Sequence, residues 1–426
     1  MIRLIDKNLF LYDLAVTAIF KDEGHYLKEW LDYHLLAGVE HFYLYNNNSS
    51  DNYKEVLAPY VEANLVTLTD FPGKMMQYPA YEDAIDKYRF DCRYMAFIDI
   101  DEFIFPKTNQ NIVEILDDIL SSNPNAAGLG INWQIFGSNG QEAADYSRGV
   151  LERFTRRAPS DWQDSNGFPN NFFKKDINNP RLVRYCINPH YSYYFSEKFV
   201  VNSNGERMKP SNKPILSDKI VVNHYIIKSK EEFLLKRKKG RAETKSKVLP
   251  PEIFQIHDRN EIFDEDILKY RAARAENFSF ESNATRFNRV INALVKNLLQ
   301  TSLEDPLVDK MEPFLTCRAV AEKFQIKIGD DLAEEIAIAW IYRTLLKANP
   351  LTIAEVQQFL KALPEILTRP FPICRELKTL TQDNVLPRLC EALKNEYVCD
   401  TGVKEEDWKV RADMIYIQQL FRLIKL

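Results

Sequence analysis

Hydrophobic positions in the first 130 residues alternate between two periods. The run Leu14–Phe20 is almost continuously apolar, as in a buried strand, whereas Leu27, Trp30 and Leu31 recur at the three- and four-residue spacing of a helix face. Strands that alternate with helices in this way predict parallel β-α-β units in an open α/β sheet. The expected strands cover residues 14–20, 42–45, 64–69 and 94–98, with helices over 27–35 and 81–88 between them.

The pattern changes twice further along the chain. Between residues 130 and 225 it is less regular, and the polar, Asn-rich segment Asp161–Asn179 is typical of a long loop. The run Ile220–Tyr225 predicts one more strand, with His224 near its end. After Pro250 and Pro251 we expect mainly helices, so the predicted domains are an α/β domain over 1–250 and a mostly helical domain over 251–426. The expected helices cover 261–276, 288–300, 331–347, 353–363 and 405–426.

Composition narrows the class of protein. The formal net charge is −5, so no overall basic field favours nucleic acid as a partner. The N-terminal residues lack the apolar core of a signal peptide, and no apolar run approaches the roughly 20 residues of a membrane span. The six cysteines are scattered and include no C-x-x-C pair, which favours reduced thiols in a cytoplasmic protein.

The strand that ends near residue 98 leads directly into three acids, Asp99, Asp101 and Glu102. Side chains alternate along a strand, so Asp99 and Asp101 are expected to point the same way. Two carboxylates at a strand end suit Mg²⁺ or Mn²⁺ that carries a phosphorylated substrate. An ordinary surface turn is the alternative for an isolated pair of this kind. Since ligands of open α/β sheets bind beyond the carboxyl ends of the strands, the turn after Asn46 should lie on the same rim.

Several sequence motifs occur in a fixed order along the first 245 residues. The chain resembles glycosyltransferase family 92, which is close to the family 2-like GT-A enzymes, and the resemblance covers roughly residues 14 to 245. The segments that carry it are Lys21–His34, Gly38–Asp51, Phe97–Phe103, Trp133–Ser138 and His224–Phe233 with Lys239-Gly-Arg241.

The resemblance implies a GT-A fold, that is, a Rossmann-like, mostly parallel mixed sheet flanked by helices. It also implies transfer of a sugar, with inversion, from a nucleotide-diphosphate sugar, UDP-sugar first of all, to a hydroxyl of a glycan or glycolipid acceptor, with Mn²⁺ or Mg²⁺. The metal ligands implied are Asp99, Asp101 and His224. The implied donor-binding residues are Ala18, Phe20 and Glu23 for the nucleotide, Asn46 for the base, Gln77 and Asp83 for the ribose and diphosphate, and Lys228 for the diphosphate.

An inverting transfer needs a general base within reach of the acceptor hydroxyl. Glu152 fits the family pattern best and is the predicted base. Glu142, Asp145, Asp161 and Asp164 remain alternatives.

The resulting prediction is a bacterial, cytoplasmic glycosyltransferase that builds a surface polysaccharide, with peripheral contact at the inner face of the membrane expected by analogy. The alternative is a non-catalytic module that binds nucleotide sugar or glycan on a degenerate GT-A domain. A metal-dependent nucleotidyltransferase is disfavoured because Lys21-Asp-Glu-Gly24 is not a Gly-rich phosphate loop.

Overall fold

The computed structural model describes residues 7–289, apart from 90, 124, 165–169, 195–197, 209–214, 240–249, 277, 280, 282–284, 287 and 288. The chain divides into two compact units, Tyr12–Phe280 on the one hand and Met1–Leu11 with Glu281–Leu426 on the other. Within the described part, no helix has both the length and the apolar character needed to cross a membrane.

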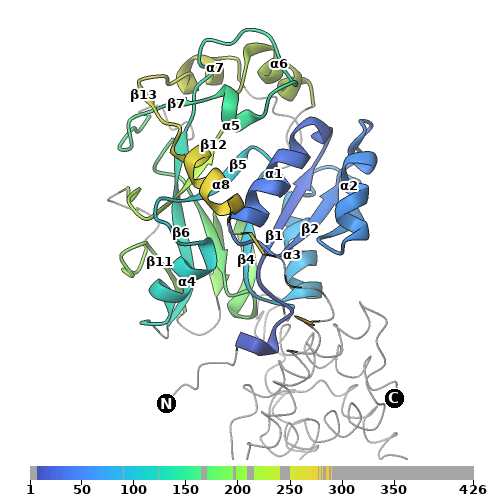
Figure 1. The fold of residues 1–426 in the computed structure, drawn as a ribbon, viewed down its shortest axis with the longest axis vertical. Coiled ribbons are helices and arrows are strands. Elements are labelled where there is room, and N and C mark those ends of the chain that lie inside the picture. Colours follow the sequence, from blue (N-terminus) through green and yellow to red (C-terminus); the bar gives the residue numbers. More distant parts are fainter. Residues whose placement is uncertain are drawn as a thin grey trace, which may run out of the picture. The chain divides into compact units, whose positions relative to one another are not determined.

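The first half of the sheet is a set of parallel strands, as expected (Figure 1). Strand β1 lies in the middle and pairs in parallel with β2 and β4, and β2 pairs in parallel with β3. Strands β1 and β2 are almost wholly buried, as their mainly apolar sequences lead one to expect, whereas the edge strand β3 is mostly half-exposed. The bounds are β1 (Tyr12–Phe20), β2 (His41–Asn46), β3 (Val66–Asp70) and β4 (Cys92–Phe97).

The second half of the sheet is mixed. Strand β8 lies between β4 and β6 and is antiparallel to both, whereas β12 and β11 are parallel to β6, and β5 is antiparallel to β12. The mostly parallel mixed sheet flanked by helices, which was expected for the GT-A fold, is confirmed. The bounds are β5 (Glu102–Pro106), β6 (Ala126–Ile135), β8 (Lys174–Asn178), β11 (Phe199–Val201) and β12 (Ile220–His224).

One part of the sequence prediction is wrong here. The segment Asp161–Asn179 is not only loop, because it contains β8, a fully buried strand between two others. Its polar side chains tolerate burial because they are paired: the Lys174 ammonium forms an ion pair with Asp176, and Lys175 reaches two further carboxylates. A run of mostly polar residues therefore concealed a central strand.

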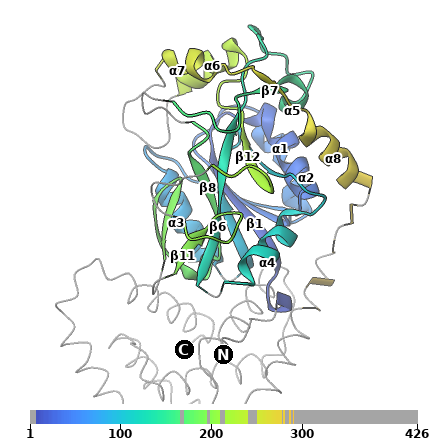
Figure 2. The same cartoon turned by 90° about the vertical axis from the view of Figure 1, so that its left-hand side faces the viewer.

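Helices cover both faces of the sheet (Figure 2). Helices α1, α2, α4 and α8 lie on one face, and α3 lies on the other. The predicted stripe on α1 is buried, and Trp30 packs against Phe42 with ring centroids 5.4 Å apart. Helix α4 begins with a capping box formed by Asn111 and Glu114. The bounds are α1 (Gly24–Leu36), α2 (Tyr53–Glu62), α3 (Gln77–Tyr88), α4 (Ile112–Leu120) and α8 (Asp266–Glu276).

Three short helices gather at one end of the sheet, together with a two-stranded ribbon of β7 and β13 (Figure 1). A second ribbon, β9 with β10, contacts α3. The bounds are α5 (Val150–Arg153), α6 (Lys230–Lys239), α7 (Glu252–His257), β7 (Arg156–Arg157), β9 (Val183–Asn188), β10 (Tyr191–Tyr194) and β13 (Ile262–Phe263), with 3₁₀ turns η1 (Lys7–Leu9) and η2 (Pro180–Leu182).

The helix predicted over 261–276 starts later than expected, since residues 262 and 263 form β13 and α8 begins at Asp266. Ile267 and Tyr270 of α8 belong to the hydrophobic core of the α/β unit, and the Tyr270 ring lies 6.5 Å from that of Tyr33. The compact unit therefore continues past residue 250 to Phe280. The helices predicted over 288–300, 331–347, 353–363 and 405–426 lie outside the described residues, apart from isolated positions before 290.

Candidate active site

The acids predicted as metal ligands lie in the turn between β4, which ends at Phe97, and β5, which begins at Glu102. The two carboxylates have different surroundings. Asp99 contacts residues of α3 and β8, and Asp101 contacts residues of β12 and α6. A turn places neighbouring side chains less regularly than a strand does, so the expectation that both point the same way on one strand does not hold.

Asp99 is held through both of its carboxylate oxygens. Its Oδ1 accepts a hydrogen bond from Gln77 Nε2 at 2.9 Å, and its Oδ2 lies 3.1 Å from Lys175 Nζ. Its backbone N–H donates to Glu102 Oε2 at 2.8 Å. Gln77 begins α3 and donates to Asp99, and its part in binding the ribose and diphosphate of a donor stays a prediction.

Glu102, the third acid, is completely buried and links three parts of the site. Its Oε2 lies 3.1 Å from Lys175 Nζ, and its Oε1 faces His224 Nδ1 at 3.9 Å. The β5–β12 register sets Glu102 directly opposite His224. Burial, with the nearby charge of Asp99, raises the pKa of Glu102 to about 8 even though Lys175 opposes this change. Among the described residues, neither Glu102 Oε1 nor His224 Nδ1 has a hydrogen-bond partner, so a small approach would let Glu102 orient the imidazole.

Asp101 and His224 form a buried pair. The Asp101 Oδ1 and His224 Nε2 atoms are 3.6 Å apart, and Trp133 stacks edge-on against the imidazole at 4.3 Å. Burial lowers the pKa of His224, which keeps the imidazole neutral near pH 7. Burial acts to raise the pKa of Asp101, but Lys236 and His224 outweigh it and hold that pKa well below its usual range. An ionised carboxylate therefore lies beside a neutral imidazole.

The donor set of this pair suits a divalent cation. Asp101 Oδ1 and His224 Nε2 are 3.6 Å apart, near enough for both to reach one divalent ion whose ligands lie at about 2.1 Å. A neutral imidazole and an ionised carboxylate are the forms that bind metal. Within residues 7–289 as described, however, no three or more His, Cys, Asp or Glu side chains are arranged to hold an ion. Asp101 and His224 lie near enough to share an ion, and the parts of Asp99, Asp101 and His224 as metal ligands stay predictions.

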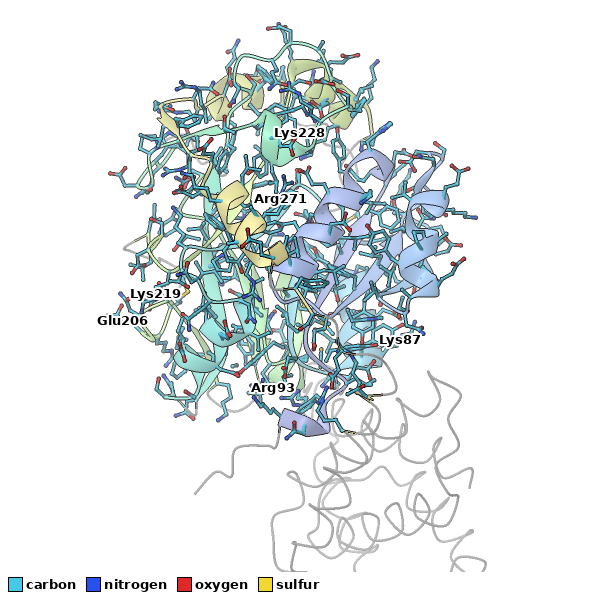
Figure 3. All side chains as sticks on the ribbon, viewed as in Figure 1. Lys87, Arg93, Glu206, Lys219, Lys228 and Arg271 are labelled. Atoms are coloured by element: carbon cyan, nitrogen blue, oxygen red, sulfur yellow. The ribbon has the colours of Figure 1, made fainter. Side chains whose placement is uncertain are left out.

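Lys228 follows β12 and is buried in an unusual backbone conformation. Its φ is +55°, in the left-handed region that non-glycine residues rarely adopt, and such strain often accompanies a functional site. Its ammonium lies 4.3 Å above the ring of Tyr26, and among the described residues no ion pair reaches it. Burial lowers the pKa of Lys228, while Asp101 acts to raise it. Figure 3 marks Lys228 at the end of the sheet where α5 and α6 lie.

Helix α6 supplies two further ammonium groups. Lys236 forms an ion pair with Asp101 Oδ2 and donates to the Ile226 carbonyl at 3.1 Å. Lys239 binds Glu23 Oε1 at 2.8 Å and donates to the carbonyls of the turn after β1, Lys21 O at 3.1 Å and Asp22 O at 2.9 Å.

Other residues predicted to bind the donor lie at the ends of strands but are already engaged. The Ala18 and Phe20 side chains of β1 are part of the hydrophobic core. Asn46 ends β2, where its amide donates to Tyr53 and Asp70 at 2.8 Å and its oxygen accepts from the Ser49 N–H. Its side chain therefore builds the turn after β2.

Two predicted residues lie apart from the acids. The Asp83 carboxylate on α3 accepts from Tyr45 and Lys87 at 2.8 Å. Glu152 on α5 pairs with Arg271 of α8 at 2.9 Å and is half-exposed. Across the described residues, no hydrogen bond or ion pair joins either of them to Asp99, Asp101 or His224. Of the alternative bases, Glu142 pairs with Lys230 at 3.1 Å, and Asp145 accepts from Ser147 within its own turn.

The sequence did not reveal two residues of the site, Lys175 and Lys236. Lys175 lies in the segment that was expected to be a loop, and nothing in its neighbours marks it. Lys236 lies in a run of nine Lys and Arg residues against three Glu between residues 228 and 247, and a basic run of this kind is as readily a solvated helix face as a binding site.

Known proteins share parts of this chain. A family model described as glycosyltransferase family 92 matches residues 15–259. A glycosyltransferase family 92 protein from Ricinus communis is 27% identical over 147 residues, which cover 34% of this chain and 26% of the relative. The galactan β-1,4-galactosyltransferase GALS2 of Arabidopsis thaliana is 31% identical over 100 residues, covering 21% of this chain and 19% of the relative. The matches thus span about a quarter or less of the length of these curated relatives.

Among solved structures, S. aureus TarS residues 1–349 in complex with UDP is 12% identical, with 78% of this chain and 89% of that chain covered and a TM-score of 0.30. A score this low carries no weight for the site. The family model spans more than half of the chain and includes the acids, His224 and Lys228. The chain belongs to glycosyltransferase family 92.

Proposed function

We propose that the chain transfers a sugar from a nucleotide-diphosphate sugar to a hydroxyl of a glycan or glycolipid acceptor, and that Mn²⁺ or Mg²⁺ is required. The observation that carries the proposal is the meeting of Asp101, His224 and Lys228 at one end of the sheet, where an ionised carboxylate, a neutral imidazole and a buried ammonium without a carboxylate partner converge. Membership of the family supports the same reaction class.

Each residue of the site has a different proposed role. Asp101 and His224 would hold the cation, and Glu102 faces the far side of the imidazole, where it can orient the ring. A bound divalent cation supplies positive charge for the oxygens of the leaving diphosphate. Lys228 is placed to donate hydrogen bonds to the same diphosphate, because its ammonium is buried and no carboxylate in the described part of the chain pairs with it.

The donor and the stereochemistry are inferred from relatives. The galactan relatives are named as β-1,4-galactosyltransferases, so a UDP-linked hexose, galactose first, is the donor to test. A β-linkage made from an α-linked nucleotide sugar requires inversion, which agrees with the predicted mechanism. The relatives named above are plant proteins, so a part in bacterial surface polysaccharide synthesis rests on the sequence prediction alone.

The general base is the least supported part. Glu152 would have to leave Arg271 before it could reach an acceptor hydroxyl. It remains the base predicted from the family pattern, and its Gln variant tests it: a base lowers the turnover of transfer far more than it lowers binding of the donor.

The proposal is tested by measuring Mn²⁺-dependent donor hydrolysis and transfer with a panel of nucleotide sugars. We expect Asp101→Asn and Asp99→Ala each to lower the rate by about 100-fold or more while the melting temperature changes little. Asp118→Asn, an exposed carboxylate on α4, is the matched control and should keep the parent rate. Full activity of the Asp101 variant in the presence of a chelator would contradict the proposal.

The alternative is a module that binds nucleotide sugar without turnover. Calorimetry with UDP and Mn²⁺ distinguishes the two readings when it is combined with the hydrolysis assay. Binding that depends on Asp101, without any hydrolysis or transfer across the panel, would favour the module.

A further inference from the structure

The three acids of the site are neutralised within the chain by two lysines of very different settings. Lys175 is a residue of the central strand β8, its side chain is 1% exposed, and it bridges the Asp99 and Glu102 carboxylates at 3.1 Å each. Lys236 is a residue of the surface helix α6, its side chain is 29% exposed, and it pairs with the single carboxylate of Asp101. Lys175 is enclosed by the sheet, whereas Lys236 reaches the site from a helix at the surface.

Lys236 pairs with the Asp101 carboxylate, which a divalent cation would need as a ligand. Its ammonium lies on Asp101 Oδ2, while Asp101 Oδ1 faces His224 Nε2 at 3.6 Å. A divalent ion between Asp101 and His224 would place a second positive charge within a few ångströms of the ammonium, and like charges at such distances repel strongly. The ion and Lys236 therefore compete for the same carboxylate.

Lys236 can leave Asp101 without moving its helix. Lys239, one turn further along α6, ties the helix to the carbonyls of Lys21 and Asp22 and to Glu23. The four-carbon stem of a lysine is flexible, and its compact ammonium changes partners readily. Once released, the Lys236 ammonium would lie near the cationic Lys228, which acts on the pKa of the same Asp101. Glu23 lies near both lysines but is already paired with Lys239, so an incoming anion would make that arrangement more favourable.

We propose that Lys236 is an exchangeable counter-ion: it neutralises Asp101 when no metal is bound, yields this carboxylate to the divalent cation, and then binds the diphosphate of the donor together with Lys228. This inference rests on the proposed function. It extends that function by assigning Lys236 to the binding machinery and by making cation and donor binding mutually dependent.

The test is titration of the full chain with Mn²⁺ alone, followed by titration with UDP at saturating Mn²⁺, by calorimetry or by the Mn²⁺ spin-resonance signal. For Lys236→Met we expect Mn²⁺ to bind about tenfold more tightly, because no internal cation has to be displaced, and UDP to bind about tenfold more weakly. Lys238→Met, an exposed lysine of the same helix, is the matched control and should change neither affinity by more than about twofold.

A second variant guards against a purely structural explanation. Lys236→Arg keeps the charge and can pair with Asp101 through two N–H groups, so it should weaken Mn²⁺ binding where the Met variant strengthens it. Opposite shifts in two folded variants, checked by their melting curves, would not arise from loss of a structural contact.

The outcomes distinguish failure of the counter-ion inference from failure of the proposed function. Parent-like or weaker Mn²⁺ binding by Lys236→Met, or unchanged UDP binding, overturns the inference while the proposed function stands. If the parent chain binds no Mn²⁺ with or without UDP, the metal requirement of the proposed function fails. If the parent chain binds no Mn²⁺ but Lys236→Met does, the counter-ion inference is still supported. If neither chain binds Mn²⁺, both the counter-ion inference and the metal requirement are overturned.

Discussion

At the scale of single residues, burial determines what the acids of the site can do. Asp99 and Glu102 share one buried ammonium, Lys175, and Asp101 shares its surroundings with a neutral His224. The sequence alone placed the acids at the end of a strand and identified His224 as their partner. It did not identify Lys175, which is distant in the chain and comes close only through the pairing of β4 with β8.

A direct prediction concerns the Lys175 ion pairs. Replacing Lys175 with Met leaves the buried Glu102 and the partly exposed Asp99 without their cation, so we expect the free energy of unfolding to fall by about 2 kcal/mol or more. Lys28→Met is the control, because it removes an exposed ion pair with Asp32 one turn away and should cost less than about 0.5 kcal/mol. Denaturation with urea measures both. Equal losses would show that Lys175 does not neutralise the acids.

At the scale of elements, three helices are joined through one carboxylate. Glu232 of α6 receives two hydrogen bonds from Arg153 of α5 at 2.8 Å and one from the hydroxyl of Tyr26 of α1 at 2.9 Å. The basic helix α6 is thus anchored over the site by its buried residues, while Lys236 and Lys239 point toward the acids and the turn after β1. The sequence shows that this segment is basic, but it does not decide whether the charged side chains face solvent or the site.

This network predicts how stability depends on pH. Burial acts to raise the pKa of Glu232, but hydrogen bonds from Arg153 and Ser229 outweigh it and lower the pKa to about 2. A carboxylate whose pKa is depressed in the folded state stabilises the fold above its ordinary pKa, and this stabilisation is lost as pH falls toward the folded value. We therefore expect the parent chain to be more stable than Glu232→Gln at neutral pH, and the difference to shrink from about pH 5 to about pH 2. Denaturation curves across this range measure it, and a constant difference would contradict the assignment.

At the scale of the whole α/β unit, the last described helix belongs to the core. The break at Pro250 and Pro251 was interpreted as a domain boundary, yet Pro251 is only the N-cap of α7, and α8 packs against α1. Ile267 and Tyr270 are buried in the same hydrophobic cluster as the residues of β1 and α1. A proline pair stops a helix or strand locally, but only packing determines which unit the next element joins.

The corresponding prediction compares two isoleucines separated by five positions. Ile267→Ala leaves a cavity in the core and should lower the free energy of unfolding of the α/β unit by about 2–4 kcal/mol. Ile262→Ala, on the exposed ribbon strand β13, should cost less than about 1 kcal/mol. If the two variants melt alike in the transition followed by tryptophan fluorescence, α8 does not belong to this core.

The sequence by itself determined the four parallel strands and helices α1 and α3 of the first 100 residues, the acids after β4, and the family, but it did not predict α2. It could do so because apolar periodicity and neighbouring motif residues are properties of a continuous segment. Only the tertiary structure decided the central place of β8, the partners of the three acids, and the core position of α8. Lys175 is 76 residues from Asp99, and Lys236 is 135 residues from Asp101. The pairing of distant charges depends on how elements pack, and no local pattern records which buried cation will meet which carboxylate.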